Sequence, residues 1–381
     1  GQISQLISQA NSSSEWTEIY KKLVSWQLKL INSSDSSVKQ IFEMLLSDAN
    51  TEFAKFIKAN YKDWFNPNHP DKPLMSASLL RSKVFPIIDG GQSVLFILVD
   101  NLRYDQWKAI EPILTSEWRV EVDETYYSIL PTATQYARNA IFAGLMPLEI
   151  QKTYPALWVF DEEDEGKNMF EQELLNAQLQ RLGKSYKTFY EKSNTLKPGQ
   201  RIVDNLKEVL KNNLSVLVYN FVDMMSHSRT DSDMMKELAS DESAYLSLTK
   251  SWFQHSDLKV LLSEASKHNV KVVITTDHGA IRVQNPIKVI GDKATSTNLR
   301  YKLGKSLNYN PKEVFEVRKP EEAHLPKQNV SSSFIFAYNN AFIAYPNNYN
   351  YYVNYYKNTF QHGGISLEEM IVPFVVLSPI E

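Results

Sequence analysis

Three strongly apolar runs in this 381-residue chain each lead into an aspartate. VLFILV precedes Asp100, LSVLVYNFV precedes Asp223, and KVVITT precedes Asp277. Apolar, β-branched runs of this length predict buried strands, whereas aspartate is depleted in strands. Parallel strands end on the same edge of a sheet, and α/β proteins bind their ligands there. The pattern therefore predicts three carboxylates at one sheet edge, where their mutual repulsion favours a bound polyvalent cation.

The N-terminal part, residues 1–66, repeats its apolar residues at helical spacing and predicts a small helical bundle. Two pairs match the spacing of a capping box at a helix start, Ser12 with Glu15 and Ser37 with Gln40. Aromatic residues in this part are interpreted as core.

The remaining chain divides into a linker and an α/β domain. Several prolines and glycines predict a linker with one short helix over 67–93. Strand and helix signals then alternate over 94–381, which predicts a mostly parallel sheet between helices. Two stretches, 151–200 and 285–355, break the alternation and are predicted to be insertions over the sheet edge. The last apolar run predicts a strand, and its Pro373 favours an edge position.

Composition excludes several classes of protein. The net charge of −3 gives no sign of a protein that coats nucleic acid through bulk charge. The chain has no cysteine, so disulfides and thiolate ligands are excluded, which suits a cytoplasmic protein. No apolar run is long enough to predict a membrane-spanning helix. The chain begins at Gly1 rather than methionine, and we expect the natural protein to extend further upstream.

Three histidines are candidate metal ligands, and two of them lie near predicted strand ends. His227 follows Asp223 in D-x-x-x-H spacing, His278 follows Asp277 directly, and His362 lies in QHGGISLEE. A single histidine is more often structural or solvated than a metal ligand. Combined with strand-end aspartates, however, the histidines form a donor set that suits zinc or manganese.

The segment LPTATQYARNAIFAG offers a candidate nucleophile, because Thr132 and Thr134 lie in a turn before a predicted helix. A threonine hydroxyl needs a base or a metal to become nucleophilic at neutral pH. A helix N-terminus would add N–H donors for an anion. Either threonine could simply be an N-cap, and from this turn alone the N-cap interpretation is favoured over the nucleophile.

Five motifs together resemble the PglZ-type branch of the alkaline phosphatase superfamily: ILVDNLRYDQW, LPTATQYARNAIFAG, DMMSH, TTDHG and HGGISLEEMIVP. They occur in this order between residues 94 and 379. A helical part ahead of a PglZ-type domain is similar to response regulators that control type IX secretion. The resemblance implies an upstream receiver domain and a sensor histidine kinase as partners.

The resemblance implies two zinc ions, with manganese as the alternative. Thr134, the second threonine of P-T-x-T, would be the nucleophile and would share one metal with Asp100, Asp277 and His278. Asn101 stands where many related diesterases have glycine, and asparagine tolerates a similar turn. The second metal would keep one position open for water or substrate. Its ligands would be Asp223, His227 and His362.

Further residues are given roles by the same resemblance or by their charge. Asn139 would help hold a phosphoryl oxygen, and Arg138 would add positive charge beside it. Arg300 and Lys302 would contact a substrate phosphate, with a solvated loop as the alternative. Arg103 would orient the Asp100 turn, or be structural.

The function implied is a two-zinc phosphodiesterase that acts on nucleotide or oligonucleotide phosphodiesters through a phospho-threonine intermediate. Tyrosines near the C-terminus would stack bases or simply pack. One alternative is a regulatory interaction module that its metals stabilise; another is a phosphomonoesterase or phosphomutase of the same superfamily. A sulfatase is disfavoured, since the nucleophile position holds threonine. A homodimer is compatible with each of these functions.

Overall fold

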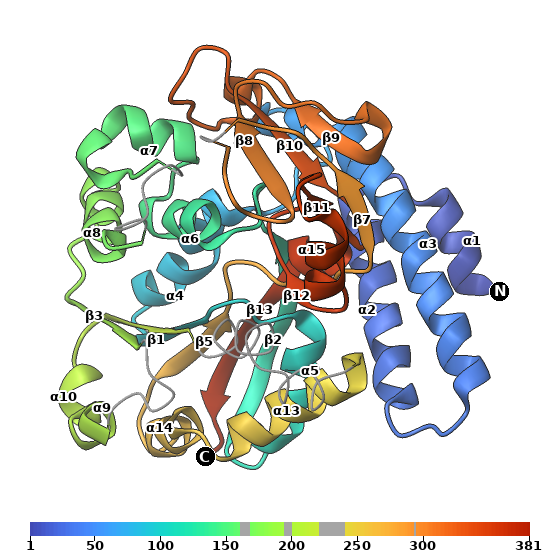
Figure 1. Ribbon diagram of the computed structural model, residues 1–381. Coiled ribbons are helices and arrows are strands. Elements are labelled where there is room, and N and C mark those ends of the chain that lie inside the picture. Colours follow the sequence, from blue (N-terminus) through green and yellow to red (C-terminus); the bar gives the residue numbers. More distant parts are fainter. Residues whose placement is uncertain (161–167, 194–199, 221–240, 293–294) are drawn as a thin grey trace.

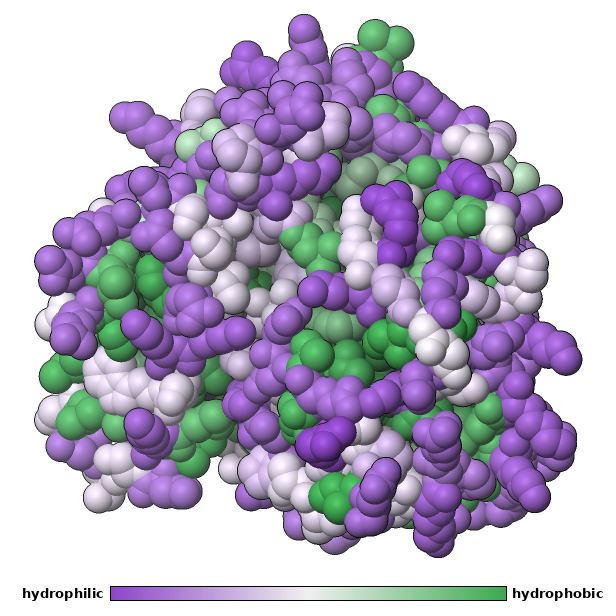
Figure 2. Space-filling model, turned by 180° about the vertical axis from the view of Figure 1, so that it is seen from behind, coloured by the Kyte–Doolittle hydropathy of each residue, from purple (hydrophilic) through white to green (hydrophobic). Residues whose placement is uncertain are grey.

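The structure is a computed structural model in which a helical N-terminal part lies along one side of an α/β part (Figure 1). The face opposite to that view is mainly hydrophilic, with scattered apolar patches (Figure 2). Within the described residues, no helix is both long and apolar enough to cross a membrane. The described residues are 1–160, 168–193, 200–220, 241–292 and 295–381.

The N-terminal part is helical, as its periodicity predicts. Trp16 packs edge-on against Phe53, and Phe53 in turn contacts Tyr127 of the sheet, so the helices share a core with the α/β part. The helical elements of residues 1–66 are α1 (Gln2–Gln9), α2 (Ser13–Leu30), α3 (Ser36–Asn60) and η1 (Lys62–Phe65).

One of the two predicted helix starts is confirmed, with the serine as N-cap. Ser12 is the N-cap of α2, and its hydroxyl accepts a hydrogen bond from the Glu15 amide at 3.2 Å. The prediction for Ser37 is wrong, because Asp35 caps α3 and accepts from the Ser37 amide at 3.0 Å. A carboxylate at this position is at least as good an N-cap as a serine hydroxyl.

The stretch expected to be a linker has regular structure and contributes to the core. Leu79, Val84 and Phe85 are each buried. Main-chain contact with the sheet begins just before them, where the Tyr127 amide donates to the Leu74 carbonyl at 2.9 Å. The helical elements are η2 (Ser76–Ser78), the π-helix η3 (Leu80–Val84) and α4 (Phe85–Asp89).

The main sheet has the strand order β2-β13-β5-β1-β4-β3. The strands β5, β1, β4 and β3 pair in parallel, and β13 runs antiparallel to β5 and β2. The predicted α/β class with a mostly parallel sheet is therefore confirmed. The strands are β1 (Val94–Val99), β2 (Trp118–Tyr127), β3 (Thr188–Ser193), β4 (Leu214–Tyr219), β5 (Lys271–Thr275) and β13 (Ile371–Pro379).

The edge position predicted for the last strand is wrong, because β13 lies between β2 and β5. Pro373 is tolerated there because the register with β5 begins one residue later, at Phe374 opposite Thr275. The Pro373 carbonyl accepts from the Thr275 hydroxyl at 2.7 Å. A proline inside a sheet is thus accommodated just outside one of its two ladders.

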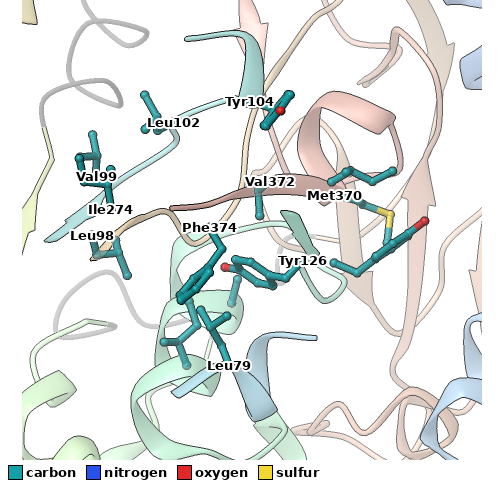
Figure 3. Close-up of a cluster of buried hydrophobic side chains, with 14 of the residues drawn as sticks. Leu79, Leu98, Val99, Leu102, Tyr104, Tyr126, Ile274, Met370, Val372 and Phe374 are labelled. Atoms are coloured by element: carbon teal, nitrogen blue, oxygen red, sulfur yellow. The ribbon is translucent and has the colours of Figure 1, made fainter. Parts of the chain in front are cut away.

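Helices cover both faces of the sheet (Figure 1). On one face α6 packs against α8, and on the other α13 packs against α5. Figure 3 shows part of the apolar core, where Tyr126 and Phe374 lie close together. The covering helices include α5 (Tyr104–Leu114), α6 (Thr134–Ala143), α7 (Pro147–Thr153), α8 (Glu171–Arg181), α9 (Gln200–Asp204), α10 (Leu206–Val209), α13 (Glu242–Gln254) and α14 (Asp257–Ala265).

Smaller sheets and several short helices follow β5 in the described residues. β8, β10 and β9 form an antiparallel sheet, β7 pairs with β11, and β6 pairs with β12. In the other stretch predicted as an insertion, β3 is an edge strand of the main sheet. The elements are β6 (Ile281–Arg282), β7 (Asn285–Lys288), β8 (Tyr301–Gly304), β9 (Val314–Val317), β10 (Ser333–Ala337), β11 (Ala341–Ala344), α15 (Tyr349–Tyr356), β12 (Phe360–Gln361) and α16 (Leu367–Met370).

Candidate metal and phosphoester site

Two of the three strand-end aspartates meet at the edge of the sheet where β1 and β5 end. Asp100 and Asp277 are both buried and lie beside the buried His278. One ligand atom from each of these residues lies within 4.8 Å of the others, which is close enough to share a metal ion. The third aspartate, Asp223, and its neighbour His227 lie outside the described residues.

Thr134 joins this group as the first residue of α6. Its Oγ1 lies 3.3 Å from Asp100 Oδ1 and 3.1 Å from His278 Nε2. The N-cap of α6 is Ala133, so Thr134 is not an N-cap. The hydroxyl therefore faces the buried acids and the imidazole at the N-terminal end of the helix.

Thr132 has a different role. Its hydroxyl donates to the Gly364 carbonyl at 2.8 Å and accepts from the Gly363 amide at 3.0 Å. Its own carbonyl lies 3.0 Å from His362 Nδ1. Thr132 thus ties its turn to the loop that carries His362, and only Thr134 of the two threonines contacts the acidic cluster.

The imidazoles of His278 and His362 stack, with ring centroids 4.1 Å apart and planes at 23°. His278 Nδ1 lies 2.9 Å from the Gly279 carbonyl. When Nδ1 donates to this carbonyl, Nε2 is directed toward Thr134, and such a backbone bond is typical of metal-binding histidines. His362 has the matching arrangement through its bond to the Thr132 carbonyl.

A short strand pair explains why these two histidines meet. His278 shortly precedes β6, and His362 directly follows β12. The two strands pair antiparallel, with Ile281 opposite Gln361. Residues more than eighty positions apart are thereby brought to the same edge, where the His362 ring stacks on His278 next to Asp277.

Arg138 binds the acids of the cluster and is itself buried. Its guanidinium lies 2.6 Å from Asp100, 3.1 Å from Asp277 and 3.2 Å from Glu171. It also donates to Asn220, the residue after β4, at 3.2 Å. Arg138 was expected to place positive charge near a substrate phosphate. The geometry instead favours a role in orienting the strand-end carboxylates, because the guanidinium is bonded to them.

The electrostatics of Asp277 follow from this arrangement. Burial by itself would raise the pKa of Asp277, but the positive charges of His278 and Arg138 outweigh it and hold the pKa well below its usual range. The Asn101 amide also donates to Asp277, at 3.2 Å. Asp277 is therefore ionised at neutral pH, as a metal ligand must be.

Arg300 and Lys302 are not substrate-binding residues, and both predictions are corrected. Arg300 is buried and forms an ion pair with Glu369, at 2.5 Å. Lys302 is buried as well, and its ammonium donates to the Ser296 carbonyl at 2.9 Å. Burial lowers the pKa of Lys302 to about 7. Both cations belong to the packing of β8, so neither the phosphate contact nor the solvated-loop alternative applies.

Three other residues, Asn101, Arg103 and Asn139, were given interpretations from the sequence. Asn101 has a φ of 65°, which confirms that asparagine adopts the left-handed turn there. Arg103 pairs with Asp105 and Glu242 and caps α5, which supports its structural alternative. Asn139 is buried in α6, one turn beyond Thr134.

Glu171 and Glu369, buried acids that pair with Arg138 and Arg300, were not identified from the sequence. Glu171 bonds Arg138 and Lys192, and Glu369 bonds Arg300 and the Gly364 amide. Glu171 lies in the unremarkable helical run EQELLNAQLQR, which carries no signal of burial. Glu369 lies in the motif HGGISLEEMIVP, and the available signal was that this acidic pair stands between apolar residues.

The fold and site together define the class. A mostly parallel sheet carries aspartates and a histidine at its strand ends, and a threonine at a helix N-terminus faces them, which is an alkaline phosphatase-like arrangement. In the family comparison, residues 79–377 match the BREX system PglZ alkaline phosphatase-like domain, and the chain belongs to this family. Residues 1–65 match the PorX response regulator linker domain.

Solved structures with a similar fold include ectonucleotide pyrophosphatase / phosphodiesterase 5. The murine protein has 14% identity and a TM-score of 0.46, covering 75% of this chain and 88% of that one. Its inactive form in complex with AMP has 14% identity and a TM-score of 0.43, covering 75% and 87%. The human protein has 15% identity and a TM-score of 0.42, covering 75% of this chain and 87% of that one. No curated protein matched the chain.

The donor set fits a divalent transition metal. Two carboxylates, an imidazole nitrogen and a hydroxyl converge, and nitrogen with oxygen ligands suits zinc or manganese. With membership of an alkaline phosphatase-like family, this buried cluster supports phosphoester hydrolysis.

Proposed function

We propose that this chain is a two-metal phosphodiesterase with Thr134 as its nucleophile, acting on nucleotide or oligonucleotide phosphodiesters. The observation that carries the proposal is the position of the Thr134 hydroxyl, 3.3 Å from Asp100 and 3.1 Å from His278 at the start of α6. A hydroxyl held between an acid and an imidazole is a candidate covalent nucleophile.

Each side chain of the site has a task in this reaction. Asp100 and His278 orient the hydroxyl, and Thr134 Oγ1 attacks phosphorus as the bond to the leaving oxygen breaks. A phospho-threonine forms, and water then attacks it and restores the hydroxyl. The N-terminal end of α6 favours the negative phosphate through its backbone N–H groups and its dipole.

The residues proposed to hold the metals are divided between two positions. Bound metals would lower the pKa of the attacking hydroxyl and neutralise charge on the phosphoryl oxygens. Asp100, Asp277, His278 and Thr134 would hold the first ion, for which zinc is proposed. The second ion would take His362 together with Asp223 and His227.

Hydrolysis of a bis-nitrophenyl phosphate diester tests the proposal, after metal analysis of the protein purified without added zinc. Thr134→Ala is expected to lower turnover by about 1,000-fold or more, as removal of a covalent nucleophile does. Thr134→Ser keeps a hydroxyl and is the matched control, with substantial activity retained. Full activity in Thr134→Ala would exclude Thr134 as the nucleophile.

A second measurement separates hydrolysis from transfer. In water enriched in oxygen-18, a hydrolase places the label in the phosphate product, whereas a phosphomutase passes the phosphoryl group to an organic acceptor. Comparing a nitrophenyl monoester with the diester determines which substrate is preferred.

We also propose that the chain is the output part of a response regulator. The match of residues 1–65 to a response regulator linker supports this context. A receiver domain, a sensor kinase, control of type IX secretion and a cytoplasmic location follow as parts of the same proposal. If a Thr134→Ala strain retained full secretion, the domain would act as an interaction module rather than through catalysis.

A further inference from the structure

A side chain from the helical segment reaches the backbone that supports both histidines. Asn50 lies on α3, is buried, and makes two hydrogen bonds to α16. Its Oδ1 accepts from the Leu367 amide at 2.8 Å, and its Nδ2 donates to Glu368 Oε1 at 2.9 Å. Leu367 is the first residue of α16, so Asn50 satisfies a helix-start amide from more than three hundred residues away.

The four-residue α16 in turn contacts the backbone of both histidine loops. Toward His278, the Gly279 amide donates to the Glu369 carbonyl at 3.1 Å. Toward His362, the Gly364 amide donates to Glu369 Oε2 at 2.9 Å. A displacement of α16 therefore moves backbone groups next to each imidazole.

The packing at Gly279 leaves little tolerance for such a displacement. A Cβ added at Gly279 would lie 1.9 Å from the Glu368 carbonyl oxygen, so α16 lies directly against this backbone. The Gly279 carbonyl is also the partner of His278 Nδ1. Burial raises the pKa of Glu368 to about 7, which marks how completely the contact with Asn50 is enclosed.

We propose that Asn50 is a positioning residue for the candidate site: it fixes α16, and α16 fixes the backbone that orients His278 and His362. The proposal rests on the proposed function and adds to it, because it makes the response-regulator-like segment a structural component of the phosphoesterase site. A shift of α3 relative to the sheet would then change the spacing of the two imidazoles.

The first test replaces Asn50 by alanine. Asn50→Ala is expected to weaken Zn²⁺ affinity, measured by competition with a chelator, by about 10- to 100-fold, the usual effect of losing a residue that orients metal ligands. Turnover of the diester should fall by a similar factor with KM changed less than about twofold, since Asn50 does not touch substrate. In the metal-free protein, NMR should show faster amide exchange at Gly279 and Gly364.

A matched control lies on the same helix. Thr51 accepts a hydrogen bond from Asn339 at 3.1 Å, which joins α3 to the α/β part without passing through α16. Thr51→Val removes this bond and should leave metal affinity, turnover and exchange at the two glycines within about twofold of the wild type. Equal losses in both variants would overturn the proposal, because they would reflect general loosening of α3.

A double variant tests the specific contact. Asn50→Asp combined with Glu368→Gln reverses donor and acceptor, so that both hydrogen bonds can form again, and it should recover most of the lost metal affinity. The proposal is overturned if Asn50→Ala lowers only the melting temperature, or if the double variant gives no recovery. A wild-type protein that neither binds zinc nor hydrolyses the diester would refute the proposed function, while amide exchange would still test the positioning.

Discussion

Two buried arginines, Arg138 and Arg300, occupy clusters that differ in one decisive respect. Arg300 meets Glu369 and two backbone carbonyls, so one charge is matched by one charge. Arg138 faces three carboxylates, those of Asp100, Asp277 and Glu171, and of these Glu171 is also paired with a second cation, Lys192. In a buried ion pair of the first kind, removal of one partner destabilises the fold, whereas an excess of converging acids leaves negative charge that a cation can neutralise.

The Thr134 and Thr132 hydroxyls show the same difference. Thr132, beside the Arg300 pair, bonds backbone groups and Glu369. Thr134, beside the Arg138 cluster, contacts an acid and an imidazole. Burial and ion pairing alone therefore do not identify a reactive site; the convergence of ligand atoms and a hydroxyl does.

Breaking the Arg300 pair should give the largest effect. Arg300→Met leaves Glu369 buried without its partner and is expected to lower the free energy of unfolding by about 3–5 kcal/mol, measured by urea denaturation. Arg119→Met is the control, because Arg119 pairs with Glu121 at the surface and its side chain is 72% exposed. A loss below about 1 kcal/mol in Arg300→Met would show that the pair does not stabilise this region.

Breaking the Arg138 cluster should act on metal binding instead. Asp277→Asn removes a proposed ligand charge, and Zn²⁺ affinity is expected to fall by about 100-fold or more, equivalent to about 2.7 kcal/mol. Asp123→Asn provides a control, since Asp123 is an acid on β2 whose partners are Tyr104, Trp107 and Lys108. Unchanged zinc affinity in Asp277→Asn would remove this cluster as the metal site.

A third prediction concerns Lys302, a buried cation near Arg300, and the pH dependence of the free energy of unfolding. Burial lowers the pKa of Lys302 to about 7 in the folded chain, against 10.5 when exposed. The folded protein therefore binds fewer protons between these values, and its stability falls as the pH drops from 10.5 toward 7. Lys302→Met should remove this slope, so the variant gains about 2 kcal/mol more at pH 7 than at pH 9 in urea denaturation. An equal gain at both pH values would mean that Lys302 keeps its ordinary pKa.

The smallest effect is expected at the exposed tyrosines of α15. Tyr351 is 65% exposed and stacks on Tyr355. Tyr351→Ala should change the free energy of unfolding by less than about 0.5 kcal/mol, as surface substitutions usually do. A larger change would show that this face is packed, while a raised KM for an oligonucleotide at unchanged stability would indicate base stacking.

Local patterns predicted much of the fold. The alternation of apolar runs and helical segments led to the α/β class, and Ser12 with Glu15 marked a helix start, because burial and capping are encoded by neighbouring residues. The last strand was misplaced at an edge, since the neighbours of β13 come from distant parts of the chain. Strand order is decided by packing that no local window contains.

Only part of the candidate site was predicted, because local patterns indicate some of its residues but not the contacts between distant ones. Strand-end position indicated Asp100 and Asp277, and motif resemblance favoured Thr134 over Thr132. Their neighbours Arg138 and Glu171 were misjudged or missed, because the partner of a buried charge is chosen by three-dimensional contact. Asn50 carried no signal at all in the sequence, although its two hydrogen bonds connect the helical segment to α16.

The amino-acid sequence by itself determined which residue types stand at the ends of buried strands and where a hydroxyl precedes a helix, because these depend on short-range periodicity. Only the tertiary structure decided which acids share an arginine, that His278 stacks on His362, and that a helix near the N-terminus supports the loop near the C-terminus. Whether two buried charges pair depends on their distance in space. The folded chain brings together residues that are hundreds of positions apart in the sequence.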